Sequence, residues 1–282
     1  MPPPPRRRRP YPPPPPGSAG GGAGRSPGPL RAAGWDHVAA WYDRLVGDAG
    51  SDYHREVLLP VTLRLLDPQP GERFIDLCCG QGVLARALLE RQAGFVLGVD
   101  ASRRLIAAAR GRGPRDPRLR YLVGDATRPG DLGPPFDGAA CVMAVQDVDD
   151  ESALFRTMAA ALRDGGRGVI VMMHPCFRVP RQSSWGWDEA RRIRYRRVDR
   201  YLTPLRVPIA THPGRDPGQH TVFYHRPLAD YLNALGAAGL AVTAAEEPRS
   251  HRRIQPGGRS RGENRAAEEF PVFLALRVVR RA

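Results

Sequence analysis

The chain contains no lysine, and all 43 of its basic residues are arginine. Together with 29 acidic residues they give a formal net charge of +14. Such an excess is typical of nucleic-acid binding. However, exclusive use of arginine, beside abundant alanine, glycine and proline, indicates the codon bias of a GC-rich genome. We therefore expect a solvated basic surface rather than an RNA-binding face.

Long apolar runs and cysteines are also scarce. No run is long enough to cross a bilayer, and the first arginines are followed by no apolar stretch of a secretory signal. The four cysteines, two of them adjacent, make a poor disulfide framework and are expected as small buried side chains. No His/Cys pair has a convincing metal-ligand spacing. We expect a cytoplasmic protein with neither a metal nor a membrane partner.

Residues 1–34 differ in composition from the rest of the chain. They contain two proline runs, a Gly/Ala/Ser tract, six arginines and no acidic residue. Such a segment buries too little apolar surface to offset the entropy of ordering, which predicts a disordered tail. Residues 35–282 are expected to form one domain.

Within residues 35–282 the pattern alternates between helix and strand. Two amphipathic helices are predicted over 35–45 and 53–66, and another over 227–238. Strands separated by helices imply parallel pairing through right-handed crossovers. The fold class predicted is α/β, with a Rossmann-like, seven-stranded, mostly parallel sheet, helices on both faces, and a lid inserted after strand five over about 174–224. The predicted strands cover 73–78, 95–99, 119–123, 138–145, 167–173, 240–245 and 270–279.

A glycine turn follows the first predicted strand. Gly80 and Gly82 fit a backbone that bends sharply and lies against a ligand with no Cβ between them, before a helix whose first N–H groups are free. Taken alone, Gly80-x-Gly82-x-x-Ala85 also fits the dinucleotide fingerprint of nicotinamide-dependent oxidoreductases.

Three aspartates end the first three predicted strands. Asp76 can attract an ammonium group, Asp100 can accept hydrogen bonds from both ribose hydroxyls, and Asp125 can accept a hydrogen bond from an adenine amino group. The set matches a ligand with all three parts. A strand-end aspartate is also often a helix cap or a turn former, and both alternatives stay open for Asp100 and Asp125.

These motifs resemble the class I S-adenosylmethionine-dependent methyltransferases. The resemblance covers about residues 35–280 and implies S-adenosylmethionine (SAM) as the cofactor, with Gly80 and Gly82 beneath its methionine and ribose portion. Asp147 falls where the family lines the cofactor near its methyl group. The cofactor-binding residues it implies are Tyr42, Asp76, Cys78, Gly80, Gly82, Asp100, Ala101, Asp125, Ala126 and Gln146. The last two predicted strands resemble the family's terminal pair, whose final strand is antiparallel.

The acceptor site is expected between two covering segments. One is the helix with Tyr42, whose aromatic face is otherwise plain core. The other is the segment after strand five, which resembles bacterial methyltransferases with the signatures His174-Pro175-Cys176-Phe177 and Ser184-Trp185-Gly186-Trp187. Its aromatic residues suit a flat or apolar acceptor. The arginine-dense run 191–200 suits phosphate or carboxylate, or is a solvated face.

His174, which follows the fifth strand, is the predicted catalytic residue. It lies near where the cofactor's methyl group would point and could act as a general base. The alternative is a histidine bonded to loop backbone. The predicted function is methyl transfer from SAM to a small-molecule acceptor. Other candidates are a nicotinamide-dependent oxidoreductase, an RNA methyltransferase and a non-catalytic SAM-binding module.

Overall fold

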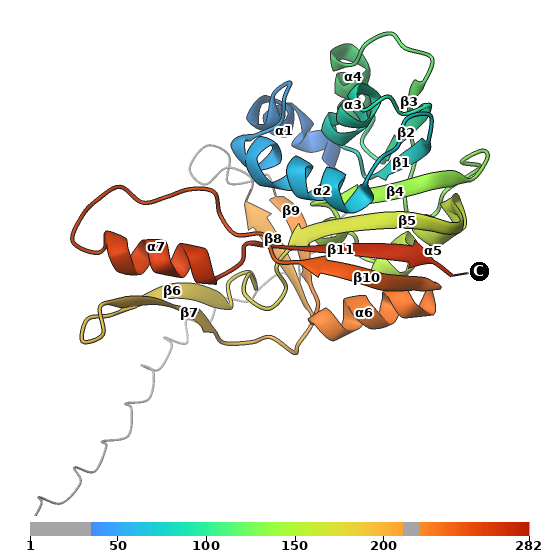
Figure 1. Cartoon of the computed structure of the whole chain (residues 1–282). Helices are drawn as coiled ribbons and strands as arrows, with labels where there is room; N and C mark the ends of the chain where they lie inside the picture. The colour runs from blue at the N-terminus through green and yellow to red at the C-terminus, as the bar shows by residue number, and fades with distance from the viewer. Residues whose placement is uncertain (1–34, 211–219, 282) are drawn as a thin grey trace, which may run out of the picture. The chain divides into compact units, whose positions relative to one another are not determined.

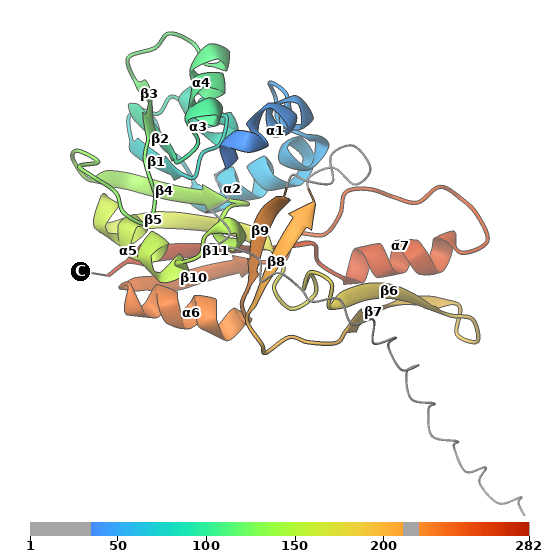
Figure 2. The same cartoon turned by 180° about the vertical axis from the view of Figure 1, so that it is seen from behind.

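The computed structural model describes residues 35–210 and 220–281, and the predicted tail over 1–34 lies outside them. A seven-stranded sheet forms the centre, in the order β10-β11-β5-β4-β1-β2-β3 (Figures 1 and 2). Strands β1 to β5 pair in parallel, and β11 pairs antiparallel with both β5 and β10. The predicted α/β fold is therefore confirmed. The strands are β1 (Arg73–Leu77), β2 (Phe95–Asp100), β3 (Leu119–Val123), β4 (Phe136–Val142), β5 (Leu162–Met173), β10 (Leu240–Glu246) and β11 (Phe273–Arg280).

Helices cover both faces of the sheet. Leu66 of α2 and Leu88 of α3 are fully buried against one face, while Phe155 of α5 and Leu235 of α6 are fully buried against the other. Burial of apolar side chains is the main favourable contribution to such a packed layer. The helices are α1 (Ala39–Val46), α2 (Leu59–Leu66), α3 (Val83–Glu90), α4 (Arg103–Arg112), α5 (Glu151–Ala161), α6 (Leu228–Ala237) and α7 (Ser260–Glu269), with short helical segments η1 (Trp35–His37), η2 (His54–Leu58) and η3 (Val145–Asp147).

The segment after β5 forms two antiparallel hairpins. The strands β6 (Ser183–Asp188) and β7 (Ile193–Val198) pair with each other, as do β8 (Leu205–Ala210) and β9 (His220–His225). Helix α7, from the connection between β10 and β11, lies alongside β6 and β7 (Figures 1 and 2). The chain therefore adds structure beside the carboxyl end of β5, where the predicted lid was placed.

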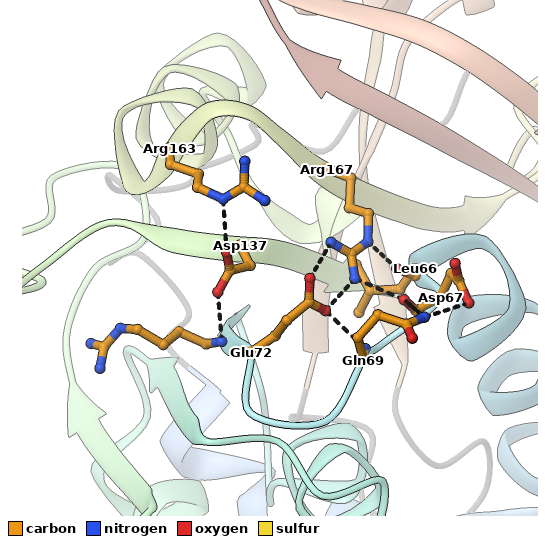
Figure 3. A network of polar contacts seen from close by, with 8 residues as sticks. Leu66, Asp67, Gln69, Glu72, Asp137, Arg163 and Arg167 are labelled. Atoms are coloured by element: carbon orange, nitrogen blue, oxygen red, sulfur yellow. Dashed lines mark hydrogen bonds and ion pairs between the residues drawn. The ribbon is translucent and has the colours of Figure 1, made fainter.

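The amino end of the sheet is held by paired charges (Figure 3). Arg167 of β5 donates to the carboxylate of Glu72, with 2.9 Å between Nη1 and Oε1, and to the carbonyl oxygens of Leu66 and Asp67. Arg163 donates to Asp137 at 2.7 Å. These bonds tie the end of α2, the start of β1 and the starts of β4 and β5 to one another.

Candidate functional site

The glycine turn bends between β1 and α3 with a left-handed backbone. Gly80 and Gly82 have φ angles of 54° and 78°. A Cβ on Gly82 would lie 2.3 Å from the hydroxyl oxygen of Tyr121, so a side chain there would displace that ring. A Cβ on Gly80 would lie 3.5 Å from the Tyr42 ring. The turn therefore needs glycine for its backbone and leaves a bare surface beneath Tyr42.

Asp100 fixes the glycine turn to the start of α4. One carboxylate oxygen accepts from the backbone N–H of Gly80 and the other from that of Ser102, each at 2.8 Å. Burial raises the pKa of Asp100, against the lowering effect of these two hydrogen bonds. Because a carboxylate has about four lone-pair positions, Asp100 keeps capacity for further donors.

Asp76, at the end of β1, is a buried carboxyl group with no cationic partner. Its exposed fraction is 2%, and no ion pair joins it to another of the described residues. Burial and, to a smaller extent, the nearby charge of Asp100 raise its pKa to about 8, against the lowering effect of a hydrogen bond from the backbone N–H of Ala85. A buried acid of this kind is stabilised in its charged form by a cation placed beside it.

Tyr42 and Asp147 close the same space from other elements. Burial raises the pKa of the Tyr42 hydroxyl, and the charges of Asp100, Asp147 and Asp76 raise it further, in that order. Helix α1 thus places Tyr42 among all three acids. Burial also raises the pKa of Asp147 well above its usual value, while a bond from the Gln146 side chain lowers it.

Only one of the two polar side-chain atoms of Gln146 has a hydrogen-bond partner among the described residues. Its side-chain nitrogen donates to the carbonyl oxygen of Met143 at 2.5 Å, and its side-chain oxygen is buried with no partner within the described ranges. A buried acceptor without a donor is unfavourable, so a ligand that brings a donor is favoured beside it.

The other four residues of the implied cofactor set lie at the ends of β1, β2 and β3, in different surroundings. Asp125 is exposed after the edge strand β3, and its carboxylate accepts from the backbone N–H of Thr127 at 2.8 Å and its hydroxyl at 2.7 Å. Both bonds end on the same oxygen, as in a turn-forming aspartate, and the second carboxylate oxygen is left for a ligand. Ala101 is exposed and Ala126 is buried. Cys78 is partly exposed, and its thiol forms a hydrogen bond with that of Cys141 of β4, which raises the pKa of Cys78.

His174 has both ring nitrogens engaged. Its Nδ1 accepts from the backbone N–H of Cys176 at 3.2 Å, so the ring proton lies on Nε2 and is donated to Glu247 at 2.7 Å. The ring is 2% exposed, and burial lowers its pKa. This geometry matches the alternative of a histidine bonded to loop backbone, because neither nitrogen has a free lone pair.

Sequence analysis missed two residues that shape the site. Tyr121 of β3 is paired with Gly98 of β2, and its ring packs beneath Gly82. Gln81 is buried within the turn and donates to the carbonyl oxygen of Gly47 at 2.9 Å, which holds the segment after α1 against the glycine turn. An aromatic residue opposite a strand glycine is a usable sequence signal for the first. The second depends on a contact 34 residues away.

The edge where these residues meet defines a class of cofactor site. Three acids without arginine partners, a bare glycine turn and a covering tyrosine suit a ligand with a cationic group and several hydroxyl donors. The helix start at Val83 has no side-chain cap, so it also offers backbone N–H groups. The fold and this edge therefore define a nucleoside-binding α/β protein.

Known proteins identify the family. The family described as "Methyltransferase domain" matches residues 74–166. The crystal structure of an S-adenosylmethionine-dependent methyltransferase from Mesorhizobium loti is 31% identical, with a TM-score of 0.63, and the match covers 78% of this chain and 96% of that one. The chain belongs to the S-adenosylmethionine-dependent methyltransferases, which confirms the predicted enzyme class and cofactor.

Curated relatives are also methyltransferases. The 2-phytyl-1,4-naphtoquinone methyltransferase of Thermosynechococcus vestitus is 31% identical over 50% of this chain and 64% of its own length. The demethylmenaquinone methyltransferase of Beutenbergia cavernae is 26% identical over 79% of this chain and 85% of its own length. The chain thus spans somewhat less than two thirds of the first of these relatives. Within the described ranges, no helix has the length and apolar character to span a bilayer.

Proposed function

We propose that the chain transfers a methyl group from SAM to a small-molecule acceptor with an aromatic or quinone-type ring. The observation that carries the proposal is the cluster of Asp76, Asp100 and Asp147 around a bare glycine turn, in a chain of this family. The two curated relatives act, by their names, on a naphthoquinone and on demethylmenaquinone, which supports a ring-shaped acceptor.

We infer the following roles for the residues around the glycine turn. Asp76 binds the cofactor's ammonium group, which replaces the cation that the acid lacks. Asp100 accepts the ribose hydroxyls with the lone pairs left over from Gly80 and Ser102. Tyr42 covers the ligand, and the oxygen of Gln146 accepts a donor from it. When bound, SAM supplies a methyl group on a sulfonium, which is already an activated leaving group.

A hydroxyl or amine acceptor must also lose a proton, and Asp147 is the better candidate for its base. Its pKa is raised well above the usual value of a carboxyl group, toward the range in which a base is effective. His174 could take the proton only after its bond from the backbone of Cys176 breaks. Alignment of acceptor and methyl group contributes the larger share of rate acceleration, on the order of 7 kcal/mol.

The test is transfer of a labelled methyl group. Full-length protein is incubated with methyl-labelled SAM and a host metabolite extract, and labelled products are identified by mass spectrometry. We expect a labelled small molecule, with turnover reduced at least about 100-fold in Asp147→Asn and unchanged in the exposed neighbour variant Asp149→Asn. S-adenosylhomocysteine should bind all three proteins equally. Binding without any labelled product would instead favour a non-catalytic SAM-binding module.

A further inference from the structure

A cavity lies away from the glycine turn. It has a volume of about 190 Å³ and is formed by the start of η2, the segment after β5, the β6–β7 hairpin and the β10–β11 connection with α7. None of the residues Tyr42, Asp76, Asp100 and Asp147 lines it. A cavity of about 150 Å³ is enough to bind benzene in a protein interior, so this one has room for a small ring-containing molecule.

The walls of this cavity are aromatic. Phe270, at the end of α7, meets Trp185 of β6 at 5.4 Å between ring centroids and Phe177 at 5.6 Å, both edge to face. Tyr53 closes another side, where its hydroxyl bonds that of Ser250 at 2.9 Å. Such rings offer flat apolar surface at little conformational cost.

The charged side chains that line this cavity are arginines. Four of the described arginines do so, and two of them are paired with acids nearby, Arg252 with Asp52 and Arg194 with Glu263 at 3.9 Å. Arg194 and Arg196 lie over the Trp185 ring at 4.5 and 5.1 Å from its centroid. Arg196 is fixed by bonds to the Phe177 carbonyl oxygen at 2.8 Å and the Ser183 hydroxyl at 2.6 Å. The net positive potential therefore comes mainly from Arg178 and from Arg196, whose side chain is held in place.

Arg178 is the unsatisfied member of the group. Its Nε is buried without a hydrogen-bond partner, and no ion pair joins its guanidinium to any residue of 35–210 or 220–281. Burial lowers the pKa of Arg178. Burial also lowers the pKa of Arg196, and the charges of Arg178 and Arg194 lower it further. Partial burial of a guanidinium is unfavourable when no anion lies beside it. The planar guanidinium can donate two parallel hydrogen bonds to one carboxylate.

We propose that this cavity is a second small-molecule site, which binds a compound with a flat apolar ring and one carboxylate or phosphate group paired to Arg178. The ring would occupy the space between Trp185, Phe270 and Tyr53, and the anion would supply the partner that Arg178 lacks. The proposal does not depend on methyl transfer, and the ligand's source is either the acceptor itself or a separate regulatory molecule.

The test uses 2-naphthoate and its neutral analogue 2-naphthalenemethanol, titrated calorimetrically into the full chain saturated with S-adenosylhomocysteine. We expect saturable binding of 2-naphthoate and at least tenfold weaker binding of the alcohol. Arg178→Gln should weaken 2-naphthoate binding at least tenfold. The matched control Arg197→Gln, which removes an exposed arginine of β7 outside the cavity lining, should change it less than twofold.

A cavity-filling variant distinguishes loss of the cavity from loss of the fold, because S-adenosylhomocysteine binding is measured on the same protein. Ala267→Phe places a ring in the cavity from α7 and should abolish binding of both probes, while the affinity for S-adenosylhomocysteine stays that of the parent. After incubation with SAM, a methyl group gained by the probe identifies acceptor chemistry, and a bound but unchanged probe identifies a regulatory site. Either result supports the site. Absence of saturable binding, or equal binding of acid and alcohol that is insensitive to Arg178→Gln, overturns it.

Discussion

Carboxyl groups at the two ends of the central sheet differ in their pairing and in the direction of their pKa shifts. At the amino end, Glu72 and Asp137 are paired with Arg167 and Arg163, and these hydrogen bonds hold their pKa values below the usual range despite burial (Figure 3). At the carboxyl end, no arginine of residues 35–210 or 220–281 pairs with Asp76 or Asp100, and burial raises the pKa values of both acids. Acids that are paired within the chain stabilise the fold. Buried acids without a partner in the chain are stabilised in their charged form by a cation from a ligand. Such acids are typical of a functional site.

The largest expected effect tests the amino end. Arg167→Met leaves the mostly buried Glu72 without its partner and removes two donors to the end of α2, so we expect the free energy of unfolding to fall by about 3 kcal/mol. Urea denaturation measures this. The affinity for S-adenosylhomocysteine should stay within twofold of the parent, because the change lies at the opposite end of the sheet.

Arg163→Met is the matched control. Arg163 is 51% exposed, whereas Arg167 is 11% exposed, so its loss should reduce the free energy of unfolding by less than about 1 kcal/mol. Equal losses from the two variants would mean that burial does not distinguish these pairs.

The next effect tests the carboxyl end through Asp76→Asn. The amide keeps the shape but cannot pair with an ammonium group, so affinity for S-adenosylhomocysteine should fall about 30-fold, which corresponds to about 2 kcal/mol. The free protein should be at least as stable as the parent, because the variant removes a buried acid. Calorimetry and urea denaturation give the two values, and a parallel loss of both would contradict a ligand-binding role.

The pH dependence of the same variant has a definite sign. The pKa of Asp76 is about 8 in the folded chain against 3.8 ordinarily, so the folded state holds a proton that the unfolded state releases between those values. The contribution of Asp76 to stability therefore falls as pH rises from about 4 to about 8. Measured without ligand, Asp76→Asn should gain stability relative to the parent over this window. Glu72 has the opposite sign, because its lowered pKa contributes stability that is lost in acid.

Sequence patterns predicted the centre of the sheet because β1, β2 and β4 are buried on both faces and read as short apolar runs. Strand β7, in contrast, is rich in arginine and largely exposed, so it has no such run. Helix α7 buries only Gly262 and Ala266, and Gly262 packs against Trp187. Because the small residues of α7 fit around a large ring from another element, its sequence shows no apolar stripe.

Sequence patterns could predict the site residues that lie at the ends of neighbouring strands. Asp76 and Asp100 lie together because β1 and β2 are neighbours in parallel register. The bond from His174 to Glu247 spans 73 residues, and no local pattern indicates it. The same holds for the hydrogen bond between the thiols of Cys78 and Cys141, which joins β4 to the residue that follows β1. Tertiary contacts of this kind decide which chemistry a side chain is free to perform.

The smallest expected effect concerns Asp125, an exposed acid that belongs neither to the arginine-paired group nor to the buried group. It is exposed, and one oxygen already accepts two hydrogen bonds from Thr127, so its second oxygen alone is left for an adenine amino group. Asp125→Ala should weaken S-adenosylhomocysteine binding by about threefold, or about 0.7 kcal/mol, since the contact is open to water. Thr127→Val removes the hydroxyl donor but keeps the acid and serves as the control. A loss in calorimetric affinity as large as that of Asp76→Asn would show that exposure is a poor guide to which strand-end acids bind the ligand.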